Sequence, residues 1–434
     1  MSAAADPLRS GAWHRLHPLS PVVRAGRGLA ALVIVVAPAL IGKHDVWGPA
    51  VQLGIVGVLA VVGLVSWLVT RWRLEEDTLR IETGLVRRRS LRFPLRQIQA
   101  IDIVRPGLAR LFGLAELRLR MGGTTGGQAR LAYLPSGQAD ALRARLLDLA
   151  HGHAPAAETP PPADEHVLLT VPPERLVASM LISRMGLVVE GLVVALVVGA
   201  VVSPDVAGAV IASSIAVILG VATAFWRRFN DEYRLTVADA PDGLRLRAGL
   251  VALTSETIRP GRVQAVRMVE PVLWRPLGWC RLEVDLAGKQ RQKGESRAAA
   301  RPVRAVLPVG SHALALELLA RILPDAPVDR VPPPRRARLK SPLRYRHLSW
   351  ALTETCAVAT TGRLARTTVW VPLAKVQSLR RVEGPLQRRL RLATVHLDTA
   401  GRNVHAALRD RDAGEADRAL SDLVRLCRAA RAAA

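Results

Sequence analysis

The side chains of this sequence that could do chemistry are mainly arginines. Arg87, Arg88 and Arg89 follow one another, and six basic residues lie between positions 335 and 346. Guanidinium and ammonium groups bind phosphate oxygens, so both clusters predict contact with anionic lipid headgroups, at about 1 kcal/mol per basic residue near a membrane surface. For the first cluster an ordinary solvated strand face explains the residues equally well. The second cluster begins with Arg335, Arg336, Arg338 and Lys340.

Nucleic acid is the competing partner for the second cluster, since the formal net charge of the chain is +25. The segment from 335 to 346 contains one tyrosine and no interleaved aromatic residues, so no platform on which bases could stack is evident. We therefore predict that nucleic acid is not a partner.

No catalytic or metal-binding pattern can be assembled from the remaining residues. There is no recognisable Ser/His/Asp order, phosphate-binding glycine loop or pair of carboxylates. Cys280, Cys356 and Cys427 are isolated, and the histidines have no metal-ligand spacing. The sequence predicts a protein that is not an enzyme and that carries no cofactor and no metal.

Four apolar runs predict two transmembrane hairpins. Arginines lie at the outer ends of each pair of runs, which places the hairpin tips outside and both termini in the cytoplasm by the positive-inside rule. We expect a multi-pass protein of the cell membrane, with the lipid bilayer as a partner. The runs are Gly28–Ile41, Pro49–Thr70, Met185–Ser203 and Val206–Phe225.

Glu190 lies within the third of these runs. An acid inside a membrane segment is a candidate functional residue. We prefer a role in which it pairs with an arginine or reaches the interface, because no second acid or base in the runs could complete a proton relay.

One pattern of residues occurs three times. Gly84, Gly249 and Gly362 each lie 15 residues before a glutamine, and those glutamines are Gln99, Gln264 and Gln377. Offsets of this regularity indicate a tandem array of one domain type. The glycines fit hairpin turns. The glutamines fit a structural role better than a functional one, because an amide side chain can bind the backbone of a neighbouring loop.

Each copy reads as strands followed by one helix, which is an α+β layout. The strands expected before the turn glycines are Thr78–Glu82, Leu244–Arg247 and Cys356–Thr360. The strands expected around the glutamines are Ile98–Val104, Val263–Val269 and Val376–Val382. The closing helices are expected at Ser136–Leu149, Ser311–Leu323 and Ala413–Ala429.

These motifs resemble the bacterial pleckstrin-homology-like membrane proteins of the YdbS/YdbT type. The resemblance rests on the turn glycine, the stretch from proline to glutamine (F-P-L-R-Q-I-Q-A-I in the first copy) and an R-x-x-G turn that contains Gly113 or Gly278. It implies tandem pleckstrin-homology (PH)-like domains, each a bent antiparallel barrel capped by a C-terminal helix. The third copy departs from this pattern, because Arg391 stands where the others have the second glycine.

The expected domain organisation combines these repeats with the apolar runs. It consists of a cytoplasmic N-terminal segment (1–27), a transmembrane hairpin (28–70), a PH-like domain (71–153), a linker (154–184), a second transmembrane hairpin (185–226), a second PH-like domain (227–324), a basic Pro/Arg linker (325–346) and a third PH-like domain (347–434).

The function that we expect is binding. The PH-like domains would bind a protein partner or lipid headgroups, and the resemblance suggests a shorter PH-like membrane protein as the partner and a role in envelope stress or toxic-peptide resistance. The alternative is a component of a membrane transport or export complex, with Glu190 in the translocation path. The sequence does not identify the ligand.

Overall fold

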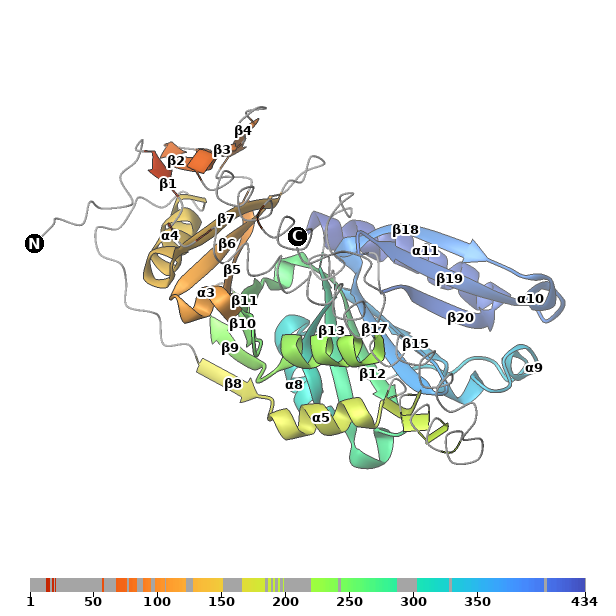
Figure 1. Cartoon of the computed structure of the whole chain (residues 1–434). Coiled ribbons are helices and arrows are strands. Elements are labelled where there is room, and N and C mark those ends of the chain that lie inside the picture. Colours follow the sequence, from red (N-terminus) through yellow and green to blue (C-terminus); the bar gives the residue numbers. More distant parts are fainter. Residues whose placement is uncertain are drawn as a thin grey trace, which may run out of the picture. The chain divides into compact units, whose positions relative to one another are not determined.

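The structure is a computed structural model of the whole chain (Figure 1). It describes the continuous segments 68–75, 78–83, 89–94, 98–105, 107–121, 128–150, 166–183, 220–240, 243–286, 303–327, 330–401 and 404–433. It also describes isolated positions between 13 and 20, at 57 and between 186 and 198.

The chain divides into two compact units. The first unit comprises Met1–Asp164 and Leu250–Thr257, and the second comprises Glu165–Gly249 and Ile258–Ala434. The first unit therefore contains the first repeat together with a strand that belongs, by sequence, to the second repeat. The second unit contains the rest of the second repeat and all of the third.

Two antiparallel sheets form the first unit. One has the strand order β1-β2-β3-β4, and the other includes the order β7-β6-β5-β11. Their facing sides bury Trp72, Leu79 and Phe93 against Ile101 and Leu117. The elements are β1 (His14–Arg15), β2 (Arg71–Glu75), β3 (Thr78–Thr83), β4 (Arg89–Pro94), β5 (Ile98–Arg105), α3 (Gly107–Leu111), β6 (Leu114–Met121), β7 (Gln128–Pro135), α4 (Ser136–Ala150) and β11 (Leu253–Ile258).

The second repeat builds one part of the second unit. Strand β13 buries Cys280, Leu282 and Val284 at alternate positions, as a strand with one face on a core does. Ser311 caps helix α8, since its hydroxyl oxygen accepts a hydrogen bond from the backbone N–H of Leu314 at 3.3 Å. The elements are β8 (His166–Thr170), α5 (Pro173–Leu181), β9 (Thr236–Ala240), β10 (Gly243–Ala248), η2 (Pro260–Arg262), β12 (Val263–Pro271), η3 (Arg275–Leu277), β13 (Trp279–Leu286), β14 (Val303–Ser311) and α8 (His312–Ile322).

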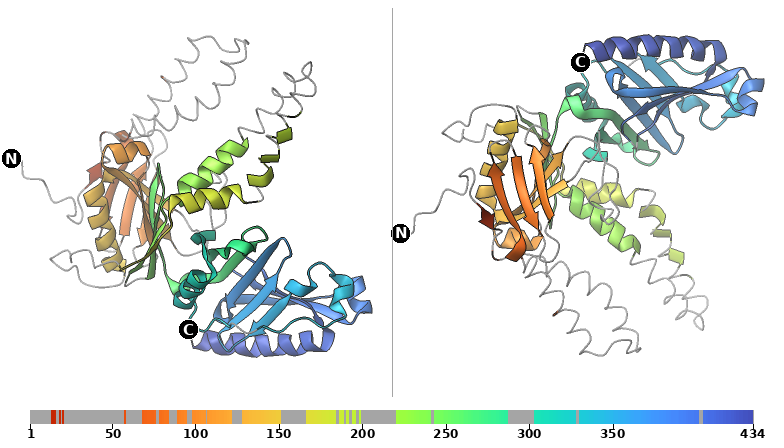
Figure 2. Two further views of the ribbon diagram at one scale, coloured as in Figure 1. Left: turned by 90° about the horizontal axis from the view of Figure 1, so that it is seen from below. Right: turned by 90° about the horizontal axis from the view of Figure 1, so that it is seen from above.

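The third repeat shares a sheet with the second. The six-stranded sheet has the order β14-β13-β12-β17-β16-β15, and a separate three-stranded sheet has the order β18-β19-β20. Helix α11 lies along this smaller sheet, as two further views show (Figure 2). The elements are α9 (Ala337–Lys340), η4 (Tyr345–His347), β15 (Ser349–Leu352), β16 (Cys356–Thr361), β17 (Ala365–Pro372), η5 (Leu373–Lys375), β18 (Val376–Val382), α10 (Pro385–Arg389), β19 (Leu392–Thr399), β20 (Ala406–Asp412) and α11 (Ala413–Ala432).

The predicted transmembrane hairpins are not supported by this fold. Among the residues that the structure describes, no helix is both long enough and apolar enough to cross a membrane. The run Gly28–Ile41 lies outside the described residues, as do most of Pro49–Thr70 and Val206–Phe225. The described end of the last run continues into a helix at 220–232, which carries Arg227, Arg228 and Glu232.

The predicted fold class and the predicted multi-pass localisation are therefore wrong. The described chain is mostly antiparallel β-sheet, with helices closing the repeats, rather than an α+β fold that includes two membrane hairpins. Long Val/Leu/Ala runs led to the error, because hydropathy alone does not distinguish membrane spans from other apolar segments. The tandem arrangement of PH-like repeats agrees with the sheets and closing helices.

A buried ion-pair network ties helix 220–232 to the sheet of the second repeat. Glu232, only 6% exposed, accepts hydrogen bonds from Arg281 at 2.6 and 3.0 Å. Arg281 also donates to Glu283 at 2.6 Å, and Arg267 donates to Glu283 at 2.9 Å. Burial alone would raise the pKa of Glu232 and of Glu283, but the neighbouring guanidinium groups hold both below the usual 4.5.

This network should make the second repeat sensitive to acid. A carboxylate whose pKa is lower in the folded state stabilises the fold above its unfolded pKa, and that contribution is lost as the pH falls through the folded pKa. We expect the free energy of unfolding to fall as the pH drops below about 4.5. This loss of stability can be measured by hydrogen exchange of the β12 and β13 amides at about pH 6 and about pH 3.5, with the rates corrected for intrinsic exchange. Equal protection at both pH values would contradict the prediction.

Candidate binding surfaces of the third repeat

The segment from 335 to 346, which we call the basic loop, is fixed to the third repeat by two of its six basic residues. Arg336 forms an ion pair with Asp412, and Lys340 forms one with Asp410. The hydroxyl of Ser341 also donates to Asp410, at 2.9 Å. Ala337 is fully buried between these anchors. These contacts do not test the sequence prediction that the cluster contacts lipid. They show which side of the basic loop faces the rest of the third repeat.

Asp410 is the buried centre of this attachment. Its carboxylate is 3% exposed and also accepts a hydrogen bond from the Nε2 of Gln387 at 2.8 Å. Gln387 donates further to Thr394 and accepts from the backbone of Gly384, so its amide is used at both ends. Because every group in this cluster has a partner, the attachment of the loop is specific in geometry.

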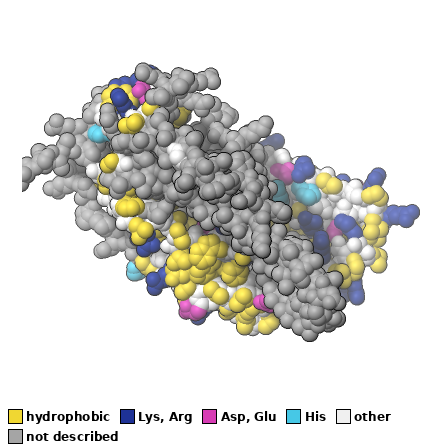
Figure 3. All heavy atoms as spheres, in the orientation of Figure 1, with side chains coloured by type: hydrophobic (Ala, Val, Ile, Leu, Met, Phe, Trp, Pro, Cys, Tyr) yellow, Lys and Arg dark blue, Asp and Glu magenta, His cyan; other side chains and the backbone are white. Residues whose placement is uncertain are grey.

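The other basic residues of the loop are exposed to solvent. Two leucines lie among them, and their exposed fractions are high, 73% for Leu339 and 63% for Leu343. Figure 3 shows Lys and Arg side chains interspersed with hydrophobic ones on the visible face of the third repeat. Two exposed leucines among cations fit contact with a partner whose surface is anionic and partly apolar. The exposed basic residues are Arg335, Arg338, Arg344 and Arg346.

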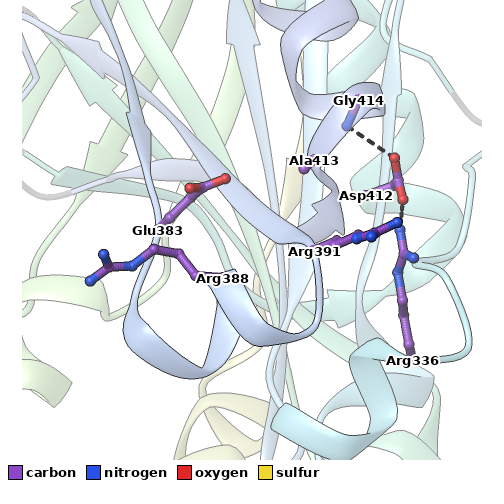
Figure 4. A pocket seen from close by; sticks show the side chains of 7 residues that line it. All are labelled: Arg336, Glu383, Arg388, Arg391, Asp412, Ala413 and Gly414. Carbon is purple, nitrogen blue, oxygen red and sulfur yellow. Dashed lines mark hydrogen bonds and ion pairs between the residues drawn. The ribbon is translucent and has the colours of Figure 1, made fainter.

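A pocket of about 350 Å³ lies beside the loop, at the start of α11 (Figure 4). Asp412 caps this helix, since its carboxylate accepts hydrogen bonds from the backbone N–H groups of Gly414 at 3.0 Å and Glu415 at 3.4 Å. Arg391 points toward Asp412, whereas Arg388 points away from it. The lining residues are Arg336, Glu383, Arg388, Arg391, Asp412, Ala413 and Gly414.

The acids of the pocket are already neutralised. Asp412 is paired with Arg336, and Glu383 is paired with Arg381 at 2.7 Å. Within the described residues, the guanidinium of Arg388 has neither a hydrogen bond nor an ion pair. The pocket therefore presents a cation with no partner in the described part of the chain.

The predicted turn glycines adopt backbone angles that favour glycine where the structure describes them. The φ angle is 127° at Gly249 and 100° at Gly362, while Gly84 lies outside the described residues. The second glycines, Gly113 and Gly278, have φ of 65° and 64°. Arg391 takes the corresponding place in the third repeat with a φ of 52°.

The other predicted residues are scattered. The Nε2 of Gln264 donates to the backbone carbonyl of Arg262 at 3.3 Å, whereas Gln377 is exposed. The side chain of Gln99 and the residues Arg87 and Arg88 lie outside the described part, and Arg89 begins β4. Glu190 is an exposed residue at a helical position. None of these residues belongs to the basic loop.

The thiols show no reactive environment. Burial is the main cause that raises the pKa of Cys280 and of Cys356 to about 12, so both remain protonated at neutral pH. In the described segments, no group of three His, Cys, Asp or Glu side chains could hold a metal ion.

Sequence reasoning missed Arg388, Asp410 and the leucines of the basic loop. The spacing of Arg388 was a usable signal, because it lies 11 residues after Gln377, just as Arg110 follows Gln99 and Arg275 follows Gln264. Asp410 had no such signal, since its partners Lys340 and Gln387 are distant in the sequence.

Repeats of antiparallel strands closed by a helix define an array of PH-like domains. The sequence matches the Bacterial PH domain family over residues 22–150, 191–312 and 313–425, so the chain belongs to that family. No curated protein matches the chain. The family assignment supports the recognised PH-like repeats and a binding role.

Proposed function

We propose that this chain is a non-enzymatic binding protein whose third repeat contacts phosphate-bearing anions, as on an anionic lipid surface, through the basic loop. The supporting observation is the division of the loop's residues: Arg336 and Lys340 attach it to Asp412 and Asp410, while four arginines and two leucines are exposed. The finer assignment to the YdbS/YdbT type is also our proposal, and it rests on the shared motifs.

The energetics favour a surface over a single small ion. Each basic residue near an anionic membrane surface contributes about 1 kcal/mol, so four exposed arginines supply about 4 kcal/mol. Leu339 and Leu343 add apolar area that a free phosphate ion would not cover. The arginines alone would bind a lipid surface or a free phosphate ion, whereas the leucines fit only an interface with an apolar layer.

The test uses the full-length chain and sedimentation with lipid vesicles. We expect binding to vesicles that contain an anionic phospholipid, weak binding to neutral vesicles, and release by salt. Changing Arg335, Arg338, Arg344 and Arg346 to glutamine should abolish most of the binding. The matched control changes four exposed arginines elsewhere in the third repeat to glutamine and should retain it: Arg409, Arg418, Arg425 and Arg428.

Two further arms identify the ligand. Replacing Leu339 and Leu343 by serine should weaken vesicle binding without changing its salt dependence. Inorganic phosphate at constant ionic strength should not compete if a surface is the ligand. Equal loss in the control variant, or equal binding to neutral vesicles, would remove the basis of the proposal.

A further inference from the structure

In this chain, the strand after the turn glycine of one repeat pairs with the glutamine strand of the repeat before it. Strand β5 of the first repeat pairs with β11, which follows the turn glycine of the second repeat. Strand β12 of the second repeat pairs with β17, which follows the turn glycine of the third. Both pairings are antiparallel. The repeats are therefore joined by strand addition.

The two pairings have the same register. At each junction, the residue five positions after the glutamine faces the residue five positions after the turn glycine. The facing residues are Val104 and Thr254 at the first junction, and Val269 and Thr367 at the second. A shift of one residue would exchange the two faces of the added strand, so identical register indicates one shared mode of docking.

An arginine makes a second equivalent contact at each junction. Arg110 donates to the backbone carbonyl of Leu250 at 3.3 Å, and Arg275 donates to that of Arg363 at 2.9 Å. Each carbonyl belongs to the residue directly after a turn glycine. The arginine thus binds the turn that precedes the added strand.

The third repeat has the docking edge of such a junction, and no described strand occupies it. Strand β18 lies beside β19, as β12 lies beside β13, but β18 ends its sheet (Figure 1). Gln377 and Ser378 are exposed, whereas the corresponding residues of β12, Gln264 and Ala265, are buried. Arg388 has the sequence position of the docking arginines, and its guanidinium has no partner among the described residues.

The first repeat has the added strand of such a junction, and it too has no described neighbour on one side. Strand β4 follows the first turn glycine and ends its sheet beyond β3. Ser90 and Leu91 are exposed, and Leu91 is 47% exposed. The corresponding residues of β17, Thr368 and Val369, are 0% and 4% exposed. Strand β4 therefore has the exposure of an added strand that is not docked.

We propose that β18 and Arg388 of one chain form a docking site for β4 of a second copy of this chain, so that copies join head to tail. The described part of the chain carries one open docking edge and one undocked added strand of the same junction. Complementary surfaces at two places on one molecule are what a head-to-tail association requires. An unpaired strand edge offers N–H and C=O groups to an incoming strand. These residues lie outside the basic loop, so the inference goes beyond the proposed function and is tested separately.

Charge complementarity supports the second copy as the occupant. The shared register would place Arg88 of one copy opposite Glu383 of the other, with Arg88, which lies outside the described residues, placed by its sequence position alone. The same two positions at the β12–β17 junction hold Arg366 and Glu270, which face each other and form an ion pair at 3.5 Å. Opposite charges that face each other across a strand pair are stabilising.

Glu383 can accept this second cation. It pairs with Arg381 at 2.7 Å, but a carboxylate has two oxygens and can bind two guanidinium groups. Glu283 shows this arrangement in the second repeat, because it pairs with both Arg267 and Arg281.

The two arginines of β18 are not free cations that would repel the arginines of β4. Arg380 donates to Asp398 at 2.6 and 3.0 Å. Arg381 pairs with Asp417 at 2.8 Å in addition to Glu383. The acids offset the charge of both arginines, so the docking edge carries little net charge of its own.

The experiment measures the mass of the purified full-length chain by sedimentation over a range of concentrations, together with hydrogen exchange of β4 and β18. We expect the mass to increase with concentration and the exchange of both strands to slow as it does. Glu383→Arg and Arg88→Glu should each raise the dissociation constant about fivefold, because an attractive pair becomes a repulsive one. An equimolar mixture of the two variants should associate as tightly as the unaltered chain, since each variant then meets the opposite charge on the other.

A second pair of variants tests the docking arginine. Changing Arg388 to glutamine should raise the dissociation constant about tenfold, as expected for the loss of one hydrogen bond from a charged donor. The same change at Arg389, an exposed neighbour on α10, should not. Far-ultraviolet circular dichroism and the melting temperature verify that each variant is folded.

Several outcomes would overturn the proposal. A chain that stays a single copy at every concentration would leave the edge of β18 to a different polypeptide. Slow exchange of both strands in single copies would mean that β4 docks on β18 of its own chain. Association that leaves the exchange of β4 or β18 unchanged, a mixture no tighter than either charge variant alone, or equal effects of the Arg388 and Arg389 variants would each refute head-to-tail docking.

Discussion

Replacing Arg281 by alanine is expected to destabilise the second repeat by about 3–5 kcal/mol, the range for removal of one member of a buried ion pair. Arg281 lies between Glu232 and Glu283, and both distances are 2.6 Å. Its side chain is 17% exposed. The substitution would leave Glu232 enclosed and lacking its main cation, so that this carboxylate must take up a proton or draw in water.

Urea unfolding of the full chain, with hydrogen exchange of β12 to β14 to localise the change, measures this loss. The matched control is Arg425→Ala, since Arg425 pairs with Asp422 at 3.2 Å but is 74% exposed, and exposed pairs contribute about 0–1 kcal/mol. Exchanging Glu232 and Arg281 together for methionine should recover part of the stability, because Glu283 keeps Arg267 as its cation and only Arg228, whose side chain is partly exposed, loses its partner Glu232. An Arg281→Ala variant as stable as the Arg425→Ala control would show that the network carries little stability.

The local structure of the repeats could be predicted from the sequence. The strand expected at Val376–Val382 has these bounds in the structure, and the helix expected at Ser136–Leu149 is Ser136–Ala150. Alternation of apolar residues and a capping serine are short-range signals, and they are sufficient to position single elements. The same signals located β12, which was expected at Val263–Val269 and extends to Pro271.

The way in which the repeats join could not be predicted. Each PH-like domain was expected to pair its own strands, yet β12 accepts β17 from the following repeat. Alternating apolar residues indicate that a strand has a buried face, but they do not indicate which strand lies beside it. The neighbour of a strand in the sheet therefore depends on the packing of the whole chain. The predicted membrane hairpins failed for a similar reason, because composition was used where three-dimensional context decides.

The basic loop shows the same limit for the residues that we propose to bind. The cluster of cations was evident from the sequence, but its division into anchors and exposed residues was not. Arg336 and Lys340 resemble Arg335 and Arg338 in type, and only the acids that face them in the fold distinguish the two groups. The sequence therefore predicted where a binding surface could lie, and the structure shows which residues of the basic loop are exposed to solvent.

Replacing Gly362 by valine is the second change for which we expect a large loss of stability. Gly362 forms the turn between β16 and β17 with a φ of 100°, a conformation that costs a residue with a side chain about 1–3 kcal/mol. An added Cβ would also lie 2.0 Å from the backbone oxygen of Ala365. This clash is with the main chain, so no rotation of a side chain relieves it, and the turn must move.

Movement of that turn would reach the second repeat, because β17 pairs with β12 and the carbonyl of Arg363 accepts the hydrogen bond from Arg275. We expect Gly362→Val to lower the melting temperature and to increase hydrogen exchange in β12 as well as in β16 and β17. Gly261→Ala is the control, since a Cβ there would meet no atom within 4 Å. If the valine variant melted like the control, or if exchange increased only in the third repeat, strand addition would not be what couples the two repeats.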